Sequence, residues 1–571
     1  TYMASSSTNF SYGFPTPGPQ NPTGTRVMDQ TFFLSEDQWR KAREQEQFDY
    51  IVVGSGFCAL AFASRILEKD PRARLLLLER GPFFLPEHCQ ALPLPFEHAI
   101  GGFSETFPWT LSATTAESKP PHYVTWQHGM VPFFGGRSTT WSGWCPEPTD
   151  EEFEDWPREV VAAAREYMPL ARDLLNVVSS DKIGNCRNDA VFGNLQREFF
   201  DFLAGRIPAF KAVTRAIYAP LAVRDPHEQG LDFIKFSTVG PLLTLVGKYP
   251  GQLKIATNCT VYRILHQNST ATALETSRGH VRIHSSSKLI LAMGSIPPAT
   301  LVLNSFPSLP NVGNRFTAHF ITAIVARIPR ASCTFADSLD KEKLELGAIY
   351  IAGVDPKNKS AQFHIQLTAI HDPDPDRNAE VAFRYMPDVV ATASTQQLKT
   401  SREKYVVLVC AVLGELEHKN ADSWLKRGGN NNGVVVEDPT TNVVLQVRET
   451  ENDLQLWDAM DETTFQVLEQ GLASALNAEG GLEYWHGETN DWRATRPSRD
   501  SIRVPGLVHE GSTMHIGGDI DPEAVVDLDY RLKGVSNVWV TGGALWPKSG
   551  SWNPTLTMVA LTQHLADNFL A

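Results

Sequence analysis

Two residues near the end of this 571-residue chain, His509 and Asn553, are of types that can handle a hydroxyl proton. An imidazole has an unperturbed pKa of about 6.5, so its neutral form can accept a proton near neutral pH. A carboxamide can orient the same hydroxyl through hydrogen bonds without titrating. The pair therefore suits chemistry in which a carbinol carbon gives up hydride while its hydroxyl gives up a proton. The alternative is that His509 is a loop histidine held by structural hydrogen bonds, and His515 is its nearest rival.

A glycine turn near the other end of the chain could place a cofactor beside such a pair. Residues 49–59 have the pattern of a strand, a turn and the start of a helix, with the spacing Gly54-x-Gly56-x-x-Ala59. The first glycine permits a tight turn, the second lets backbone approach a phosphate, and the alanine allows close helix packing. The helix N-terminus adds N–H donors and a positive dipole. The segment predicts a dinucleotide pyrophosphate site.

A carboxylate strengthens that prediction. Glu79 follows the apolar run 75–78 and lies 25 residues after Gly54 (79 − 54), where it can accept hydrogen bonds from a ribose diol. The glycine pattern alone is a weak signal, because ordinary strand–turn–helix packing also favours glycine. With two strands and an acid in place, dinucleotide binding becomes the preferred interpretation. These residues do not separate FAD from NAD.

Composition limits the other function classes. The chain is long enough for two domains, and 42% hydrophobic with 20% charged residues is typical of a globular enzyme. A net charge of −14 argues against a nucleic-acid partner. The seven cysteines are scattered without a Cys-x-x-Cys pair, which favours reduced, buried thiols over disulfides or zinc. The carboxylates show no spacing for metal ligands, so we expect no metal.

The N-terminal residues and the longest apolar run indicate where in the cell the protein is expected. Residues 1–46 form an extension whose first residues are polar and contain no apolar core of a signal peptide. The best candidate for a membrane span, 289–306, is interrupted by Pro297 and Pro298. We therefore expect an intracellular protein with no membrane partner.

The pattern of apolar runs predicts an α/β fold. The strands 50–53 and 75–78 flank a helix at 60–67, which is a βαβ unit of a parallel sheet. Later runs such as 405–413 and 434–437 predict that roughly 310–505 is a mainly antiparallel region.

Several motifs in order resemble the glucose–methanol–choline (GMC) oxidoreductases from about residue 47 to the C-terminus, most weakly in the middle third. They are the segments 53–59, 75–81, 135–139, 289–295, 542–543 and 553–557. The segments 132–141 and 506–513 look most like the pyranose 2-oxidase branch.

The resemblance implies a Rossmann-like FAD-binding domain and a substrate-binding domain built on a largely antiparallel sheet. It assigns 47–170, 245–310 and 506–571 to the first domain and 171–244 and 311–505 to the second. The residues that it places on FAD are Gly54, Gly56, Ala59, Glu79, Gly135, Gly136, Ser138, Thr139, Ser142, Val261, Gly294, Gly543, Pro554 and Thr555. It makes His509 the general base and Asn553 its partner, and it puts His515 outside the substrate pocket.

One residue departs from the family pattern. Pyranose oxidases typically carry a histidine, bonded covalently to the flavin, in the position that Thr140 occupies here. A threonine hydroxyl is not expected to form that bond, so the sequence predicts non-covalent FAD.

The resemblance leaves three functions open. The first is oxidation of an alcohol (a pyranose, a polyol or a natural-product alcohol) by hydride transfer to flavin N5, with O2 or another acceptor reoxidising the flavin. The second is a lyase of the same fold without net redox chemistry, and the third is a non-enzymatic flavoprotein. Trp546 and Trp552 are equally compatible with lining a substrate pocket and with packing in the core. The sequence leaves the substrate, the acceptor and the oligomeric state open.

Overall fold

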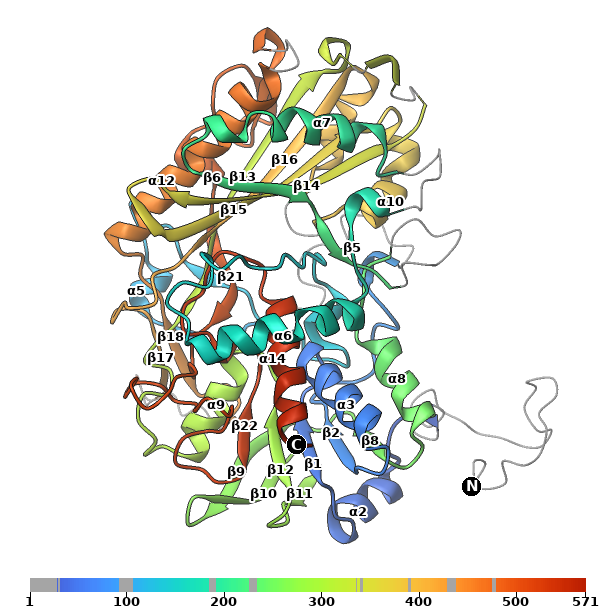
Figure 1. Cartoon of the computed structure of the whole chain (residues 1–571), viewed down its shortest axis with the longest axis vertical. Helices are drawn as coiled ribbons and strands as arrows, with labels where there is room; N and C mark the ends of the chain where they lie inside the picture. Colours follow the sequence, from blue (N-terminus) through green and yellow to red (C-terminus); the bar gives the residue numbers. More distant parts are fainter. Residues whose placement is uncertain are drawn as a thin grey trace, which may run out of the picture.

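Two sheets organise the chain, an antiparallel one in the upper half of Figure 1 and a parallel one in the lower half. The structure is a computed structural model. It describes residues 28, 31–91, 106–183, 191–224, 234–334, 336–338, 342–388, 392–428, 438–474 and 479–570. The run 434–437 that we expect to be a strand lies outside the described residues. In the described part, no helix is long and apolar enough to cross a membrane.

The lower sheet has five parallel strands in the order β22-β12-β1-β2-β8. Their bounds are Val538–Val540, Lys288–Leu291, Tyr50–Val53, Leu75–Leu78 and Leu253–Ala256. Strands β1 and β2 are buried along their whole length, as expected for parallel strands covered on both faces. Both strands have the bounds that the sequence predicts. The connecting helix α3 (Phe57–Lys69) begins three residues earlier than expected, directly after the glycine turn.

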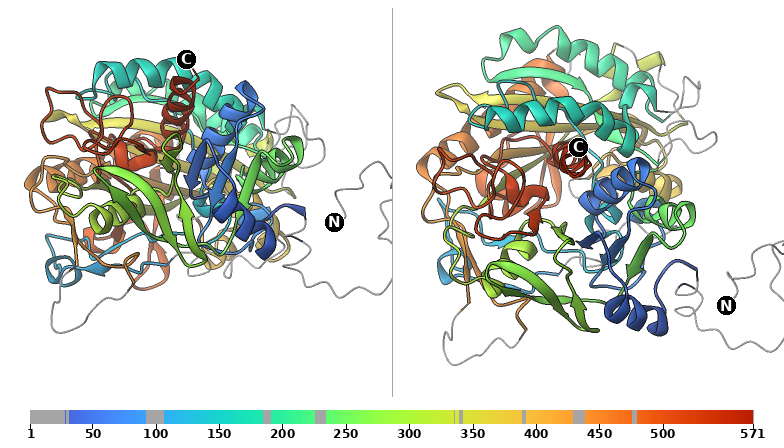
Figure 2. Two further views of the ribbon diagram at one scale, coloured as in Figure 1. Left: turned by 90° about the horizontal axis from the view of Figure 1, so that it is seen from below. Right: turned by 60° about the horizontal axis from the view of Figure 1, so that its bottom comes forward.

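Helices from distant parts of the chain cover this sheet. Helix α3 packs against α14 (Thr555–Asn568), which in turn packs against α6 (Arg158–Leu175). Figure 2 shows α14, the dark red helix that ends near the C-terminus, close to the blue elements that include α3. The first turns of α3 and α14 thus lie near each other although about 500 residues separate them. This packing brings together two helices that lie far apart in the sequence.

The upper sheet is antiparallel apart from one short edge strand. Its main order is β20-β19-β13-β16-β15-β14-β6, and β21 pairs with β13 and with β4. Their bounds are Asp491–Arg493, Glu483–His486, Thr317–Pro329, Tyr405–Glu415, Asn358–His371, Glu345–Asp355, Val213–Tyr218, Arg503–Gly511 and Trp126–Gln127. Helices α7 (Asn194–Ala204) and α12 (Glu451–Gln466) cover one face (Figure 1). The predicted fold class, a parallel sheet beside a largely antiparallel one, is confirmed.

Smaller elements complete the two halves. Strands β9 (Val261–Gln267), β10 (Thr270–Thr276) and β11 (Gly279–Arg282) form one small sheet. Strands β17 (Trp424–Arg427), β18 (Val443–Gln446) and β3 (Thr110–Leu111) form another, and β5 (Val177–Ser179) pairs with β7 (Pro220–Ala222). The other α-helices of the described residues are α2 (Glu36–Gln45), α5 (Ala113–Ala116), α8 (Val239–Lys248), α9 (Ile296–Ser305), α10 (Pro375–Tyr385), α11 (Thr395–Lys399) and α13 (Arg499–Ile502).

Two elements cross the domain limits that the sequence suggests. Helix α8 spans the limit at 244/245 and packs against α3 and β8 of the parallel half. Strand β21 spans the limit at 505/506 and pairs along β13 in the antiparallel sheet. The two halves are therefore closely connected at β21, and the domain limits remain a proposal.

Candidate active site

One cavity receives residues from both sheets. Its wall contains the carboxyl ends of β1 and β2, the start of β9, the end of β21 and the first turns of α3 and α14. Strands β13, β15 and β16 supply its wall on the antiparallel side through Ile321, Gln366, Ala411 and Leu413. A crevice at the carboxyl ends of parallel strands is where α/β folds bind their ligands.

The glycine turn leaves room for a phosphate. Gly54 has a φ of +108°, and a Cβ there would lie 2.3 Å from the Ala292 carbonyl oxygen, so only glycine fits. A Cβ on Gly56 would meet no atom within 4 Å, because this position faces the open cavity. Gly56 also begins α3 without a side-chain cap, which leaves the N–H groups of the first turn open to a ligand. The turn therefore fits the diphosphate of a dinucleotide.

Glu79 lies at the end of β2 in the cavity wall. One carboxylate oxygen accepts from the Ser55 hydroxyl at 2.5 Å and the other from the Gly81 N–H at 2.8 Å. Burial raises the pKa of this carboxyl, and the same two hydrogen bonds oppose the rise. The carboxylate is thus held in place, and its remaining lone pairs are available for the expected ribose contact.

The second glycine loop packs against the first. The Gly135 N–H donates to the Ser55 hydroxyl oxygen at 2.9 Å, and Gly135 has a φ of +94°. A Cβ there would lie 2.6 Å from a Val239 methyl carbon. The Ser138 hydroxyl donates to the Gly135 carbonyl, and the Thr139 hydroxyl donates to the Gly136 carbonyl. The loop therefore supports the cavity from behind.

Ten of the fourteen residues expected to hold FAD line the cavity. They are Gly54, Gly56, Glu79, Gly136, Ser142, Val261, Gly294, Gly543, Pro554 and Thr555. The other four, Ala59, Gly135, Ser138 and Thr139, are not part of its lining. Ala59 is buried in the packing of α3, and the other three belong to the supporting loop. Pro554, the N-cap residue of α14, provides no side-chain cap, so a second set of open N–H groups faces the cavity.

His509 reaches the cavity through an irregularity in β21. Between Thr317 and His319, β13 advances two residues while β21 advances three, from Gly511 to Val508. The extra residue forms a bulge, and His509 there has a φ of +59°, an unfavourable value for a residue with a side chain. Strained backbone of this kind is concentrated at functional sites.

A second histidine holds His509. Nδ1 of His319 lies 2.9 Å from Nδ1 of His509, and Nε2 of His319 lies 2.7 Å from the Gly550 carbonyl oxygen. Burial lowers the pKa of His509 well below its usual 6.5, and His319, His364, Arg137 and His128 lower it further. The imidazole of His509 is therefore neutral at neutral pH, the form that accepts a proton.

Asn553 is held in a matching way. The Gln366 side-chain amide donates to Asn553 Oδ1 at 3.1 Å and lies 3.2 Å from Nε2 of His364. With its oxygen engaged, the Asn553 side chain presents its NH2 group as a donor. His509 and Asn553 both line the cavity.

Sequence patterns alone did not identify the residues that hold this pair. His319, His364 and Gln366 lie on β13 and β15. Their strands are buried almost throughout, so the apolar pattern points to a sheet and not to a site. The sequence does offer one signal, a histidine inside an apolar strand, because a buried imidazole needs a hydrogen-bond partner.

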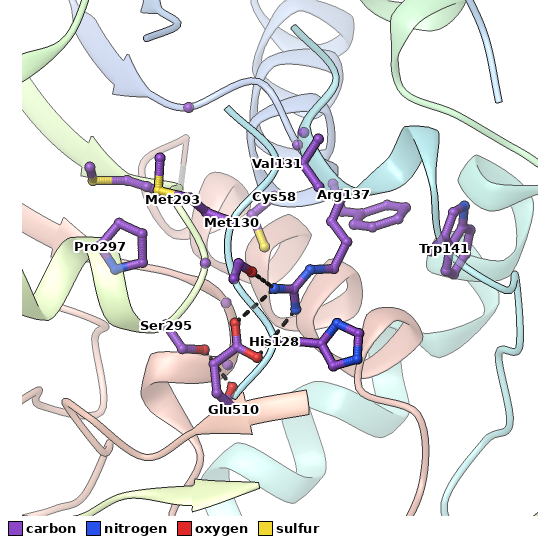
Figure 3. Close-up of a pocket in the computed structure, with 18 of the residues that line it drawn as sticks. Cys58, His128, Met130, Val131, Arg137, Trp141, Met293, Ser295, Pro297 and Glu510 are labelled. Atoms are coloured by element: carbon purple, nitrogen blue, oxygen red, sulfur yellow. Dashed lines mark hydrogen bonds and ion pairs between the residues drawn. The ribbon is translucent and has the colours of Figure 1, made fainter. Parts of the chain in front are cut away.

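Polar side chains also line the cavity elsewhere. The Ser142 hydroxyl donates to Asp388 at 2.9 Å, and both residues lie in the wall near Trp141. Figure 3 shows Arg137 projecting between His128 and Glu510. The guanidinium pairs with the Glu510 carboxylate at 3.2 Å and donates to the Gly129 carbonyl.

Three other candidates from the sequence do not enter the cavity lining. His515 is buried and lies 3.0 Å from the Asp521 carboxylate, so it has a structural partner. Trp546 and Trp552 are buried and pack on Trp156, with ring centroids 5.1 and 5.9 Å away, which favours the packing interpretation. Among the described residues, no group of His, Cys, Asp and Glu could hold a metal ion.

Comparisons with known proteins agree with this architecture. The family described as GMC oxidoreductase matches residues 434–562 through its C-terminal domain. Human mitochondrial choline dehydrogenase is 21% identical over 568 residues, covering 92% of this chain and 90% of that protein. The crystal structure of pyridoxine 4-oxidase from Mesorbium loti superposes with a TM-score of 0.58 at 15% identity, covering 92% and 99% of the two chains. The chain is thus similar to the GMC oxidoreductase model over residues 434–562, and it shares its fold with the solved structure.

Proposed function

We propose that this protein is an FAD-dependent oxidoreductase that oxidises an alcohol, with His509 as the general base. The observation that carries the proposal is the convergence of His509 and Asn553 on a cavity that two uncapped helix N-termini also face. The open backbone at Gly56 and Gly294 fits FAD, because a Cβ at either position would meet no atom within 4 Å. Gly56, Glu79 and Val261 would hold the adenosine diphosphate half.

The reaction follows from the state of the two side chains. A substrate hydroxyl would lie between the neutral His509 imidazole, which accepts its proton, and the Asn553 amide, which donates to its oxygen. Bound FAD would supply N5 as the hydride acceptor and would pass the electrons to O2 or another acceptor. The N-terminus of α14 stabilises negative charge that develops nearby. His509 then holds the proton until solvent or product removes it.

The wall of the cavity favours a substrate with several hydroxyls. Asp388 and Ser142 accept and donate hydrogen bonds on one side, while Ile321, Ala411 and Leu413 offer apolar contact. A pyranose, a polyol or a hydroxylated natural product combines both kinds of surface. The resemblance to the pyranose 2-oxidase branch supports this class.

The cofactor is proposed to be non-covalent. Thr140 lines the cavity, and its hydroxyl lies 3.5 Å from the Arg137 carbonyl oxygen. A threonine hydroxyl is a poor nucleophile without an activating base. Acid precipitation should therefore release the flavin into the supernatant, and flavin that remains in the pellet would contradict this part of the proposal.

The proposed reaction is tested by an anaerobic titration of the purified protein with a panel of sugars, polyols and other alcohols. Bleaching of the flavin band near ~450 nm by one class establishes alcohol oxidation and names the substrate class. A flavin that no alcohol bleaches favours a lyase of the same fold. A protein that takes up no flavin when FAD is added contradicts the cofactor assignment.

A further inference from the structure

His319 is buried, lies outside the cavity lining and contacts the proposed base directly. It occupies β13, one strand away from His509 on β21, in the register where the bulge turns His509 towards the cavity. Its side chain bridges two fixed points, the Gly550 carbonyl and the His509 ring. The protons on this bridge can be assigned from the chemistry of the atoms.

The Gly550 carbonyl fixes the first proton. A carbonyl oxygen only accepts hydrogen bonds, so at 2.7 Å the His319 Nε2 must carry a hydrogen. Burial lowers the pKa of His319 to about 4, with the Gly550 bond opposing the shift, so the ring is neutral at neutral pH. A neutral ring protonated on Nε2 has a lone pair on Nδ1.

The second proton follows from the first. Two ring nitrogens 2.9 Å apart need one hydrogen between them, and His319 Nδ1 has none to give. His509 must therefore donate from its own Nδ1. Its Nε2 is left as the unprotonated nitrogen of the ring, which is the nitrogen that a general base uses.

The Gly550 carbonyl is itself held in place. Gly550 has a φ of +60°, and a Cβ there would lie 1.9 Å from the Trp552 ring. Trp552 is fully buried and packs against Phe153 and Trp156. This rigid aromatic cluster lies directly behind the bridge, which gives Trp552 a role in the site without contact to the cavity.

We propose that His319 is a positioning residue that sets the tautomer of His509, so that Nε2 of His509 is the basic atom facing the substrate. The inference rests on the proposed function in so far as His509 is the base of an alcohol oxidation. The tautomer itself is a property of the protein and can be measured without turnover.

The first test is nuclear magnetic resonance of the FAD-loaded protein with 15N-labelled histidine rings. Signals of His509 are assigned as those that disappear in His509→Asn. We expect its Nδ1 to be protonated and its Nε2 to be unprotonated at neutral pH. The opposite tautomer in the native protein would overturn the proposal, whatever the protein oxidises.

The second test compares two substitutions of His319. His319→Asn keeps an acceptor, Oδ1, near the place of Nδ1, whereas His319→Phe removes it. We expect His319→Phe to lose the native tautomer signal and to slow anaerobic flavin reduction roughly 10²-fold or more, the scale of lost general-base catalysis. His319→Asn should retain the tautomer and most of the rate.

A matched control separates this role from stability. His371→Asn changes another buried histidine of the upper sheet, on β15 and outside the cavity lining. It should leave the His509 signals and the reduction rate unchanged. Bound FAD, read from the visible spectrum, must be equal in all variants compared. A His319→Phe protein that binds FAD and keeps both the native tautomer and the native rate would also overturn the proposal. If no alcohol reduces the flavin in any variant, the proposed function fails and the tautomer measurement still decides this inference.

Discussion

At the scale of single residues, the site works by holding two neutral polar side chains in a fixed orientation. His509 and Asn553 differ in chemistry, but each has one polar atom occupied by a buried partner and one left for a ligand. The partners, His319 and Gln366, come from the antiparallel sheet, so the direction of both hydrogen bonds depends on rigid strands. This arrangement provides an acceptor and a donor for one hydroxyl.

Removing the base should separate catalysis from cofactor binding. His509→Asn is expected to slow anaerobic flavin reduction by about 10²- to 10⁴-fold while FAD remains bound, since general-base catalysis has that magnitude. Stopped-flow absorbance measures the rate. The matched control is His515→Asn, because His515 is buried six residues away and pairs with Asp521 outside the cavity lining. Equal losses in both variants would contradict the role of His509.

The pH dependence follows from the lowered pKa of His509. The neutral ring is the active form, so the reduction rate should stay constant above pH ~6.5 and fall only at more acidic pH, as the ring becomes protonated. Between the folded and unfolded pKa values the unfolded chain binds more protons, so stability also falls on acidification. Melting measured at each pH separates the two effects. A rate that still rises between pH 7 and 9 would contradict His509 as the titrating base.

At the scale of elements, the two glycines of the first turn, Gly54 and Gly56, have different roles. Gly54 is required by the fold, because a side chain would collide with the Ala292 carbonyl in a left-handed conformation. Gly56 faces open space, so a side chain there would fill the place of a ligand.

We therefore expect Gly56→Val to fold and to lose FAD affinity by at least about 10-fold, since it blocks close approach to the phosphate and the helix N–H groups. Gly54→Ala should lower the free energy of unfolding by roughly 1–3 kcal/mol through backbone strain, before any effect on FAD. Equilibrium unfolding of the apoproteins and FAD titration measure the two quantities. A Gly56→Val protein that binds FAD normally would remove the basis for placing the diphosphate at this turn.

Strands β1 and β2 of the parallel half could be predicted from the sequence. The bulge in β21 and the buried side chains that hold His509 and Asn553 could not. Strands β1 and β2 have short apolar runs bounded by glycine and polar residues, so their limits can be identified locally. The bulge in β21 depends on how this strand pairs with β13, nearly 200 residues earlier, and no local pattern shows it. His319 and Gln366 went unrecognised for the same reason, since their role depends on pairing between distant strands. The motif order supplied His509 and Asn553, but it did not supply what holds them.

At the scale of the whole molecule, the cavity joins two halves that otherwise have separate sheets. Its lining takes residues from the parallel half, such as Gly56, and from the antiparallel half, such as Gln366. The net charge of −14 repels an anionic cofactor at long range, so binding must come from local groups. The open N-termini of α3 and α14 are suited to that.

A ligand that contacts both halves should stabilise the molecule as one unit. Binding to the folded state alone adds RT ln(1 + [L]/Kd), or about 4 kcal/mol at a free FAD concentration 1,000 times Kd. We expect the melting temperature of the apoprotein to rise steadily with added FAD, with both sheets unfolding in one transition. Calorimetry of the native protein beside Gly56→Val checks this, because the variant should melt alike with and without FAD. Two separate transitions of which FAD moves only one would show that the cofactor is held by the parallel half alone, which would leave the upper sheet free to move relative to the base and partner that it positions.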